Sequence, residues 1–417
     1  MPDAAAAGPS DRSLLALPLA LLFVSALPDA MVVPVLHDLM VQRYGVTPAA
    51  AHAFMCVNLL GALAVVGVIG RLRRRCGDGA IIAAAAALNA VLLAVMALPI
   101  GFTVTLLVRF GEGAADLLVY GFLFDFIARA GRATSKGRRM GAAATCLMLG
   151  ISAGIGIGGA LGTIDSVLSL WLGSLACLLV AMTARPLMRR ERWLAAPAAP
   201  AAPRGPLRRA SLWPALVMMF TDRAVVGVLV STVPLYLVAH AGLSSGPIGA
   251  VIGLSMLMTA LGAWPAGMMA DRFGAARLRL AAGLVFAAAF AAIVPTATLG
   301  ALPLGVALLA FGIAGAALFA GSLSVVIRSG RGPAGMAAYH AAGNLGFLFG
   351  PTVAGLALRF TASAATEAGT CAAIITGFAL LHLIGTAVAG LGATGRIACA
   401  ADPALEAARP QAELAAP

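Results

Sequence analysis

A succession of twelve apolar runs, each long enough to cross a bilayer as a helix, limits what this chain can fold into. A membrane-spanning helix needs about 20 apolar residues. The runs cover 14–37, 51–70, 79–100, 102–128, 140–163, 165–184, 212–239, 246–270, 277–298, 301–327, 335–358 and 368–392. Because backbone groups in lipid must be hydrogen-bonded within their own segment, these runs predict an all-α membrane protein with twelve transmembrane helices.

Composition supports a membrane location. The chain of 417 residues is 61% hydrophobic and 11% charged, whereas soluble domains are about 25% charged. Its net charge of +12 does not indicate nucleic-acid binding, because the basic residues form short clusters between apolar runs. We therefore expect the lipid bilayer as a partner and no nucleic acid.

No residue pattern in the sequence indicates an enzyme. The six cysteines are scattered without a CxxC pair, and GIGIGG, which superficially resembles a dinucleotide loop, lies inside an apolar run. No nucleophile–base arrangement is apparent. We therefore expect no enzyme activity, no metal, and no cofactor other than a proton gradient.

The distribution of arginine predicts the orientation. Clusters follow the second, fourth, sixth, eighth and tenth runs, whereas the odd-numbered connections carry only Arg43 and Arg359. Positively charged loops stay in the cytoplasm, so both termini are predicted to be cytoplasmic. Arginine far outnumbers lysine and alanine is abundant, which is typical of a GC-rich bacterium. We expect a multi-pass protein of a bacterial inner (cytoplasmic) membrane.

The chain divides near its middle and repeats itself. The segment LAAPAAPAAPRGPLRRA is a semi-rigid Ala/Pro spacer. We expect a cytoplasmic tail (1–13), a six-helix bundle (14–193), the linker (194–210), a second bundle (211–395) and a cytoplasmic tail (396–417). Pro34 matches Pro234, Gly67 matches Gly267, and Gly154 matches Gly350, in nearly constant register. Paired repeats are typical of secondary transporters, which bind substrate between them.

Several motifs resemble the major facilitator superfamily over nearly the whole chain. Gly267-Met-Met-Ala-Asp271-Arg272-Phe-Gly274 is similar to its cytoplasmic loop motif, and Arg109-Phe-Gly-Glu-Gly113 to its fourth-helix motif. The pattern DAMVVPVL from Asp29 is similar to the first helix of its drug exporters. The chain is identified as a member, nearest the 12-helix drug:proton antiporter branch. The resemblance implies two pseudo-symmetric six-helix bundles that alternate access to a small-molecule site, and we expect a monomer.

The loop motif implies a gate at the cytoplasmic side. In the family this loop latches helices that separate when that side opens, which assigns Gly267, Asp271, Arg272 and Gly274 to the gate. In the first-half copy Arg71 stands where the acid should be, so we expect the second-half latch to act. The first-half loop would be held by contacts of arginine with lipid or carbonyl groups. Asp125 and Arg139 resemble further latch partners.

Small residues in the fifth and eleventh runs predict a closely packed, bendable seam. This glycine seam consists of Gly150, Gly154, Gly158 and Gly159, with Gly350 and Pro351 in the second-half copy. The glycines resemble the antiporter motif of the family. Ile155 stands where that motif has proline, a departure from the antiporter pattern.

Ionisable residues inside the runs are candidates for coupling and binding. Arg109, Glu112, Asp116 and Tyr120 fall on one stripe of a helix, with Asp125 roughly opposite. Asp29 and Arg109 lie at similar depth and are expected to pair. Asp222 and Asp116 are expected to lie at the same depth in the membrane. Arg223, next to Asp222, could therefore reach Asp116 from the other half. Four acids against two arginines leave two carboxylates for protons or for a cationic substrate.

The tenth run has no charge, and Phe311, Phe319 and Ser322 are predicted to form a mostly apolar cavity wall. That wall favours an amphipathic substrate over a sugar. The leading hypothesis is proton-coupled efflux of a small amphipathic or drug-like compound. The alternatives are proton-coupled uptake of a small metabolite and a non-transporting membrane sensor or assembly factor.

Overall fold

The chain is described from a computed structural model, which covers residues 11–130, 136–190, 212–328, 332–361 and 364–400. Helices make up the fold in this part of the chain. They are α1 (Asp11–Ser25), α2 (Leu27–Leu36), the π-helix η1 (His37–Gln42), α3 (Pro48–Arg75), α4 (Asp78–Ala97), α5 (Phe102–Arg129), α6 (Lys136–Gly162), α7 (Leu168–Thr183), α8 (Arg185–Arg190), α9 (Trp213–Ala241), α10 (Ser245–Phe273), α11 (Ala275–Ala297), α12 (Ala301–Arg328), α13 (Gly332–Leu358) and α14 (Ala364–Ala400). The tail 1–13 and the linker 194–210 fall wholly or largely outside the described residues, as does the tail 396–417 after residue 400.

The predicted all-α membrane fold is confirmed. Within the described residues, eleven segments are long and apolar enough to cross a membrane, and the first of them, Leu14–Gln42, combines α1, α2 and η1. The remaining predicted span is α5, a helix of 28 residues that carries Arg109, Glu112 and Asp116. These three charges within the span set α5 apart from the other spans, although it is as long as α3.

The first span is broken, whereas the sequence predicted one continuous helix over 14–37. Helix α1 ends at Ser25 and α2 begins at Leu27, with Pro28 in its first turn. Proline has no N–H to donate to the carbonyl four residues earlier, so the helix is interrupted at this point. The break places Asp29 in the first turn of α2.

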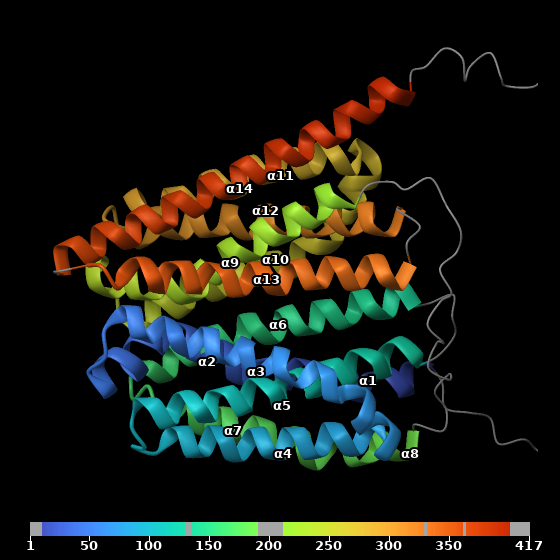
Figure 1. Ribbon diagram of the computed structural model, residues 1–417, viewed down its shortest axis with the longest axis vertical. Coiled ribbons are helices and arrows are strands. Elements are labelled where there is room, and N and C mark those ends of the chain that lie inside the picture. Colours follow the sequence, from blue (N-terminus) through green and yellow to red (C-terminus); the bar gives the residue numbers. More distant parts are fainter. Residues whose placement is uncertain (1–10, 131–135, 191–211, 329–331, 362–363, 401–417) are drawn as a thin grey trace, which may run out of the picture.

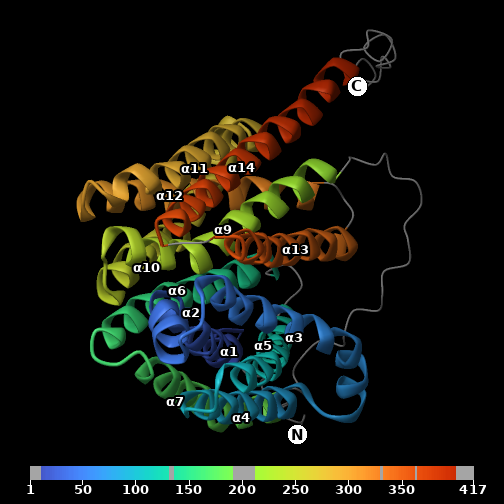
Figure 2. The same cartoon turned by 60° about the vertical axis from the view of Figure 1, so that its left-hand side comes forward.

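The helices form two groups, α1–α8 and α9–α14, which occupy the lower and upper parts of Figure 1. Across their boundary α6 packs against α10 and α3 against α13. We call the end where α3 and α5 finish and α4 begins the basic end, because Arg73, Arg74, Arg75 and Arg129 lie there. The basic end is on the right in Figure 1, and Figure 2 shows the two groups from another direction.

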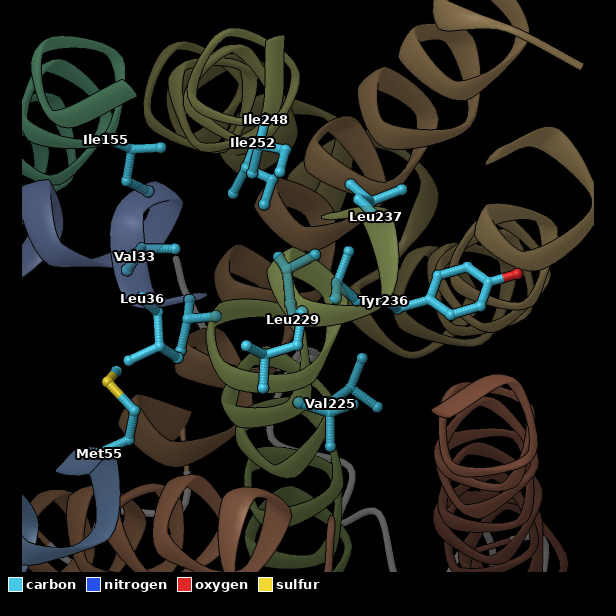
Figure 3. Packing of buried hydrophobic residues seen from close by; sticks show 14 of the residues in the cluster. Val33, Leu36, Met55, Ile155, Val225, Leu229, Tyr236, Leu237, Ile248 and Ile252 are labelled. Atoms are coloured by element: carbon cyan, nitrogen blue, oxygen red, sulfur yellow. The ribbon is translucent and has the colours of Figure 1, made fainter. Parts of the chain in front are cut away.

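The hydrophobic cores show that the two groups are joined at one end. At the end opposite the basic end, Val33 and Met55 of the first group share a core with Leu229 and Ile252 of the second (Figure 3). Towards the basic end the cores are separate. One cluster consists of residues from the first group, on α1 and α3–α8. Another consists of residues from the second group, on or next to α9, α12 and α13.

The glycine seam explains how closely helices approach. A Cβ added at Gly154 would lie 2.6 Å from the Leu27 carbonyl oxygen of α2, and Gly150 and Gly158 also face the broken first span. Gly159 instead faces α10, where a Cβ would lie 2.8 Å from the Cα of Gly249. Gly350 and Pro351 similarly pack α13 against α9. The seam therefore holds helices together within each half, and at Gly159 it holds the two halves together.

Candidate functional site

Arg109 is the centre of a buried charge cluster between α2 and α5. Its Nη2 donates to Oδ1 of Asp29 at 2.7 Å, and its Nη1 donates to Oε2 of Glu112 at 2.6 Å. Arg109 is 1% exposed and Glu112 is completely buried. The contact between Asp29 and Arg109 expected from their depths is therefore present. The Asp29 side chain, at 30% exposure, is the accessible member of this pair.

Two asparagines that the sequence analysis did not assign to the site connect the cluster to α3 and α4. Asn58 donates from Nδ2 to Oε2 of Glu112 at 2.7 Å, and Asn89 donates to Oδ1 of Asp116 at 2.5 Å. Phe54 covers the Arg109 guanidinium, 4.6 Å from its ring centroid. Asn89 is the only polar side chain in the run 79–100, and this signal could have identified it.

The cluster contains more acid than base. One carboxylate oxygen from each of Asp29, Glu112 and Asp116 lies within 4.8 Å of the others. Among the described residues, Arg109 is the one cation hydrogen-bonded in the cluster, to Asp29 and Glu112. Glu112 Oε1, Asp116 Oδ2 and the Asn89 amide oxygen are buried without a hydrogen-bond partner. With all groups ionised the cluster would carry a charge of −2, with three free acceptor atoms. Three free oxygen acceptors and a negative charge can bind a proton or a small cation.

Tyr120 has a positioning role next to the cluster. Its hydroxyl donates to the Ser25 carbonyl oxygen at 2.8 Å, where α1 ends. The break in the first span leaves this carbonyl free for a side-chain donor. Tyr120 therefore stabilises the break that places Asp29.

Asp222 and Arg223 do not join this cluster. Their electrostatic neighbours, Tyr339 and His340, belong to the second half. The predicted reach of Arg223 to Asp116 is not seen, because Arg223 lies against α13 near Gly343. The first-half cluster thus has three acids and one arginine instead of four acids and two arginines.

The predicted cavity wall on α12 is largely internal packing. Phe311 is 1% exposed and stacks on Phe286, with ring centroids 4.1 Å apart. Ser322 is buried and hydrogen-bonded with Tyr339. Phe319 is half-buried. Phe311 therefore packs in the core in this structure, and the assignment of these residues to a mostly apolar cavity wall stays a prediction.

At the basic end the first-half loop is held by ion pairs. Arg73 contacts Asp125 and lies 3.4 Å from Asp78, while Arg129 contacts Asp78 and donates from Nε to Asp125 at 2.7 Å. The expectation of lipid or carbonyl contacts for this loop is wrong. Arg71 is exposed, and Asp78 supplies the acid that position 71 lacks, paired with Arg73 and Arg129.

Carbonyl contacts occur at Arg139. It donates to the carbonyl oxygens of Ile127 at 3.2 Å and Ala128 at 3.0 Å. Arg139 therefore ties the start of α6 to the last turn of α5.

The described residues of the second-half loop include two motif glycines and Arg272. Gly274 adopts a φ of +88°, which glycine tolerates and other residues rarely adopt. Gly267 has open space around it. Arg272 is exposed and lies over the Phe273 ring at 5.4 Å, without an ion pair among the described residues. The side chain of Asp271 lies outside the described part. The first-half loop carries ion pairs, and the expected second-half latch at Asp271 stays a prediction.

Comparison with known proteins assigns the family. The sequence profile of the Major Facilitator Superfamily matches residues 19–351. The chain belongs to the Major Facilitator Superfamily. Among curated proteins none matches the chain by sequence.

Solved structures share the superfamily fold. A bacterial homologue of the human lysosomal transporter Spinster, inward-facing and occupied, matches with a TM-score of 0.72 and 16% identity, covering 93% of this chain and 98% of that one. The nucleoside transporter NupG matches with a TM-score of 0.67 and 15% identity, covering 90% and 98%. The human organic anion transporter MFSD10 matches with a TM-score of 0.55 and 18% identity, covering 92% and 100%.

Membership of this superfamily makes the chain a multi-pass membrane transporter of small molecules and not an enzyme. The two pseudo-symmetric six-helix bundles agree with the superfamily fold. Identities this low support the shared fold and carry no information about the substrate.

Proposed function

We propose that this chain is a proton-coupled secondary transporter that exports a small amphipathic compound by alternating access. The observation that carries the proposal is the acidic cluster, where three carboxylates share the single guanidinium of Arg109. An uncompensated charge inside a membrane protein is costly, so the surplus carboxylates favour taking up protons. Asp29 is the exposed member, and it gives protons a route to Glu112 and Asp116.

Alternating access accounts for the two kinds of core. The shared core closes one end, and the separate cores at the basic end leave the halves free to be apart there. With the arginine clusters in the cytoplasm, this arrangement is the inward-facing state, in a bacterial inner membrane with both termini cytoplasmic. The protein works as a monomer, because each chain contains both halves and the whole cluster.

Proton release in inside-out vesicles tests this function. A pH dye reports proton movement after addition of amphipathic cations, anions and neutral compounds. We expect at least one compound to release protons through the wild type, and Asp116→Asn and Glu112→Gln to abolish the release. Asp165→Asn is the matched control, because Asp165 is an exposed carboxylate outside the cluster.

The direction of proton movement separates the alternatives. Proton movement in the same direction as the compound would indicate metabolite uptake in place of efflux. Normal protein levels with no response to any compound would contradict proton-coupled transport and favour a sensor or assembly role.

A further inference from the structure

Arg279 on α11 is a buried arginine that has no counter-ion among the described residues. It is 5% exposed, and its Nη1 has no hydrogen-bond partner. In the part of the chain that the structure describes, no carboxylate lies within ion-pair distance of its guanidinium. Unpaired charges are rarely buried, because the lost hydration must be replaced. A neighbouring exposed arginine, Arg277, shows that α11 has water-facing positions for such a side chain.

Tyr339 connects Arg279 to polar side chains on α12 and α9. Its electrostatic neighbour is the hydroxyl of Tyr339 on α13, which is 1% exposed. Tyr339 is hydrogen-bonded with Ser322 of α12 and lies within electrostatic range of Asp222 and Arg223 of α9. Asp222, the one carboxylate in this group, forms no ion pair with Arg279. We call Arg279, Tyr339, Ser322, Asp222 and Arg223 the second-half polar cluster.

The two polar clusters differ in the sign of their charge. The second-half cluster contains two arginines and one aspartate, which gives +1 with all groups ionised. The first-half cluster, with Arg109 against Asp29, Glu112 and Asp116, gives −2. Guanidinium donors match the geometry of carboxylate and phosphate oxygens, and a tyrosine hydroxyl adds a neutral donor.

We propose that Arg279, with Tyr339 and Arg223, binds the carboxylate or phosphate group of an amphipathic ligand. The inference rests on the proposed function in one respect, since it names the compound carried as an amphiphile with an anionic head. Arg279 is in the second turn of α11, near the basic end, where the halves have separate cores. The oxyanion comes either from a compound in the water or from the headgroup of a bilayer lipid.

Binding to the purified full chain tests the proposal without a proton gradient. The probes are octyl phosphate, octanoate and, as the neutral match, octanol, added to protein in nanodiscs of zwitterionic lipid. Intrinsic tryptophan fluorescence during heating reports the unfolding midpoint. The variants are Arg279→Gln, Arg279→Lys and Tyr339→Phe, with Arg277→Gln as the exposed control two residues away.

The expected result is a higher midpoint with both anions and no change with octanol, in the wild type and Arg277→Gln. Loss of one charged hydrogen-bonding partner should weaken the apparent affinity of Arg279→Gln about tenfold or more. Arg279→Lys should bind with intermediate affinity, and Tyr339→Phe should bind more weakly than the wild type. Equal anion binding by Arg279→Gln and wild type would overturn the proposal, as would equal shifts with octanol.

The source of the oxyanion is resolved by repeating the titration in nanodiscs containing phosphatidylglycerol. If octyl phosphate raises the midpoint equally in both lipids, the ligand comes from the water. If the rise is lost only with phosphatidylglycerol, the lipid headgroup already occupies the site. Either result supports the oxyanion site. Failure of proton release in vesicles would leave this binding result intact, so the two proposals fail separately. If Arg279→Gln does not fold, Tyr339→Phe decides, because it removes a donor without changing the charge.

Discussion

Arg109 Nη2 lies 2.7 Å from Oδ1 of Asp29, and this contact joins α5 to α2 immediately after the break in the first span. The same guanidinium also holds Glu112 on its own helix. One cation therefore links a segment interrupted by proline to the most highly charged span. The stability of the first half depends on this arginine.

Replacing Arg109 should be severely destabilising and partly reversible by a second change. Arg109→Gln leaves Glu112 and Asp29 without their cation, and removal of one partner of a buried pair costs about 3–5 kcal/mol. The double variant Arg109→Gln, Glu112→Gln also lacks one of the carboxylates. It should therefore recover part of the stability lost in Arg109→Gln. Thermal unfolding in detergent measures both, with Arg272→Gln as an exposed arginine control. A double variant no more stable than the single one would count against a charge imbalance.

Tyr120→Phe should impair transport more than its stability cost alone explains. Loss of the bond to the Ser25 carbonyl should cost about 1 kcal/mol, and Asp29 would be less firmly placed. Tyr44→Phe is a matched control, because it also loses a hydroxyl contact, 2.9 Å from Thr105 near the start of α5, and keeps the bond at the break in the first span. Proton release per folded protein compares the two. Equal losses in both variants would remove the positioning role from Tyr120.

Gly159→Ala should loosen the closed end. Its Cβ would meet the backbone of Gly249 on α10, whereas Gly156→Ala on the same helix would meet open space. Cys56, whose Sγ lies 3.4 Å from Thr352 Oγ1 across the halves, reports the opening. In a chain that retains Cys56 alone, a water-soluble maleimide should label Gly159→Ala several-fold faster than Gly156→Ala. Identical rates would mean that the contact does not hold the end closed.

The arginines after α3 should differ in importance. Arg73→Gln breaks contacts with Asp78 and Asp125 and should cost about 1 kcal/mol, because the network is partly exposed. Arg71→Gln should cost nothing measurable, since Arg71 is exposed. Unfolding midpoints at low and high salt measure both, and the Arg73 effect should shrink as salt rises. A larger effect at Arg71 would restore it to the gate.

Periodicity and depth predicted the parts of this protein that follow from helix geometry. Apolar length identified every span, and the contact between Asp29 and Arg109 followed from counting residues from the helix ends. The rotation of α9 could not be predicted that way, so Arg223 was expected near Asp116. Contacts that depend on packing, such as Asn89 with Asp116, need the neighbouring helix to be placed first.

The loop motif was misread for a similar reason. Alignment by position put Arg71 where an acid belongs, but Asp78 at the start of α4 supplies the acid to the ion pairs of this loop. An acid supplied by the next helix cannot be found from the spacing of residues within the motif. Phe311 was likewise assigned to a wall by helix number alone, and its stacking on Phe286 depends on how α11 and α12 pack.

The charged character of α5 has a consequence for biosynthesis. Each buried charge at mid-membrane raises the cost of inserting a lone helix by about 2.5–3.5 kcal/mol, so α5 is a poor membrane segment by itself. Its polar partners Asp29, Asn58 and Asn89 all precede it in the chain. They leave the ribosome first, and α5 enters the bilayer beside side chains that already match its polar face.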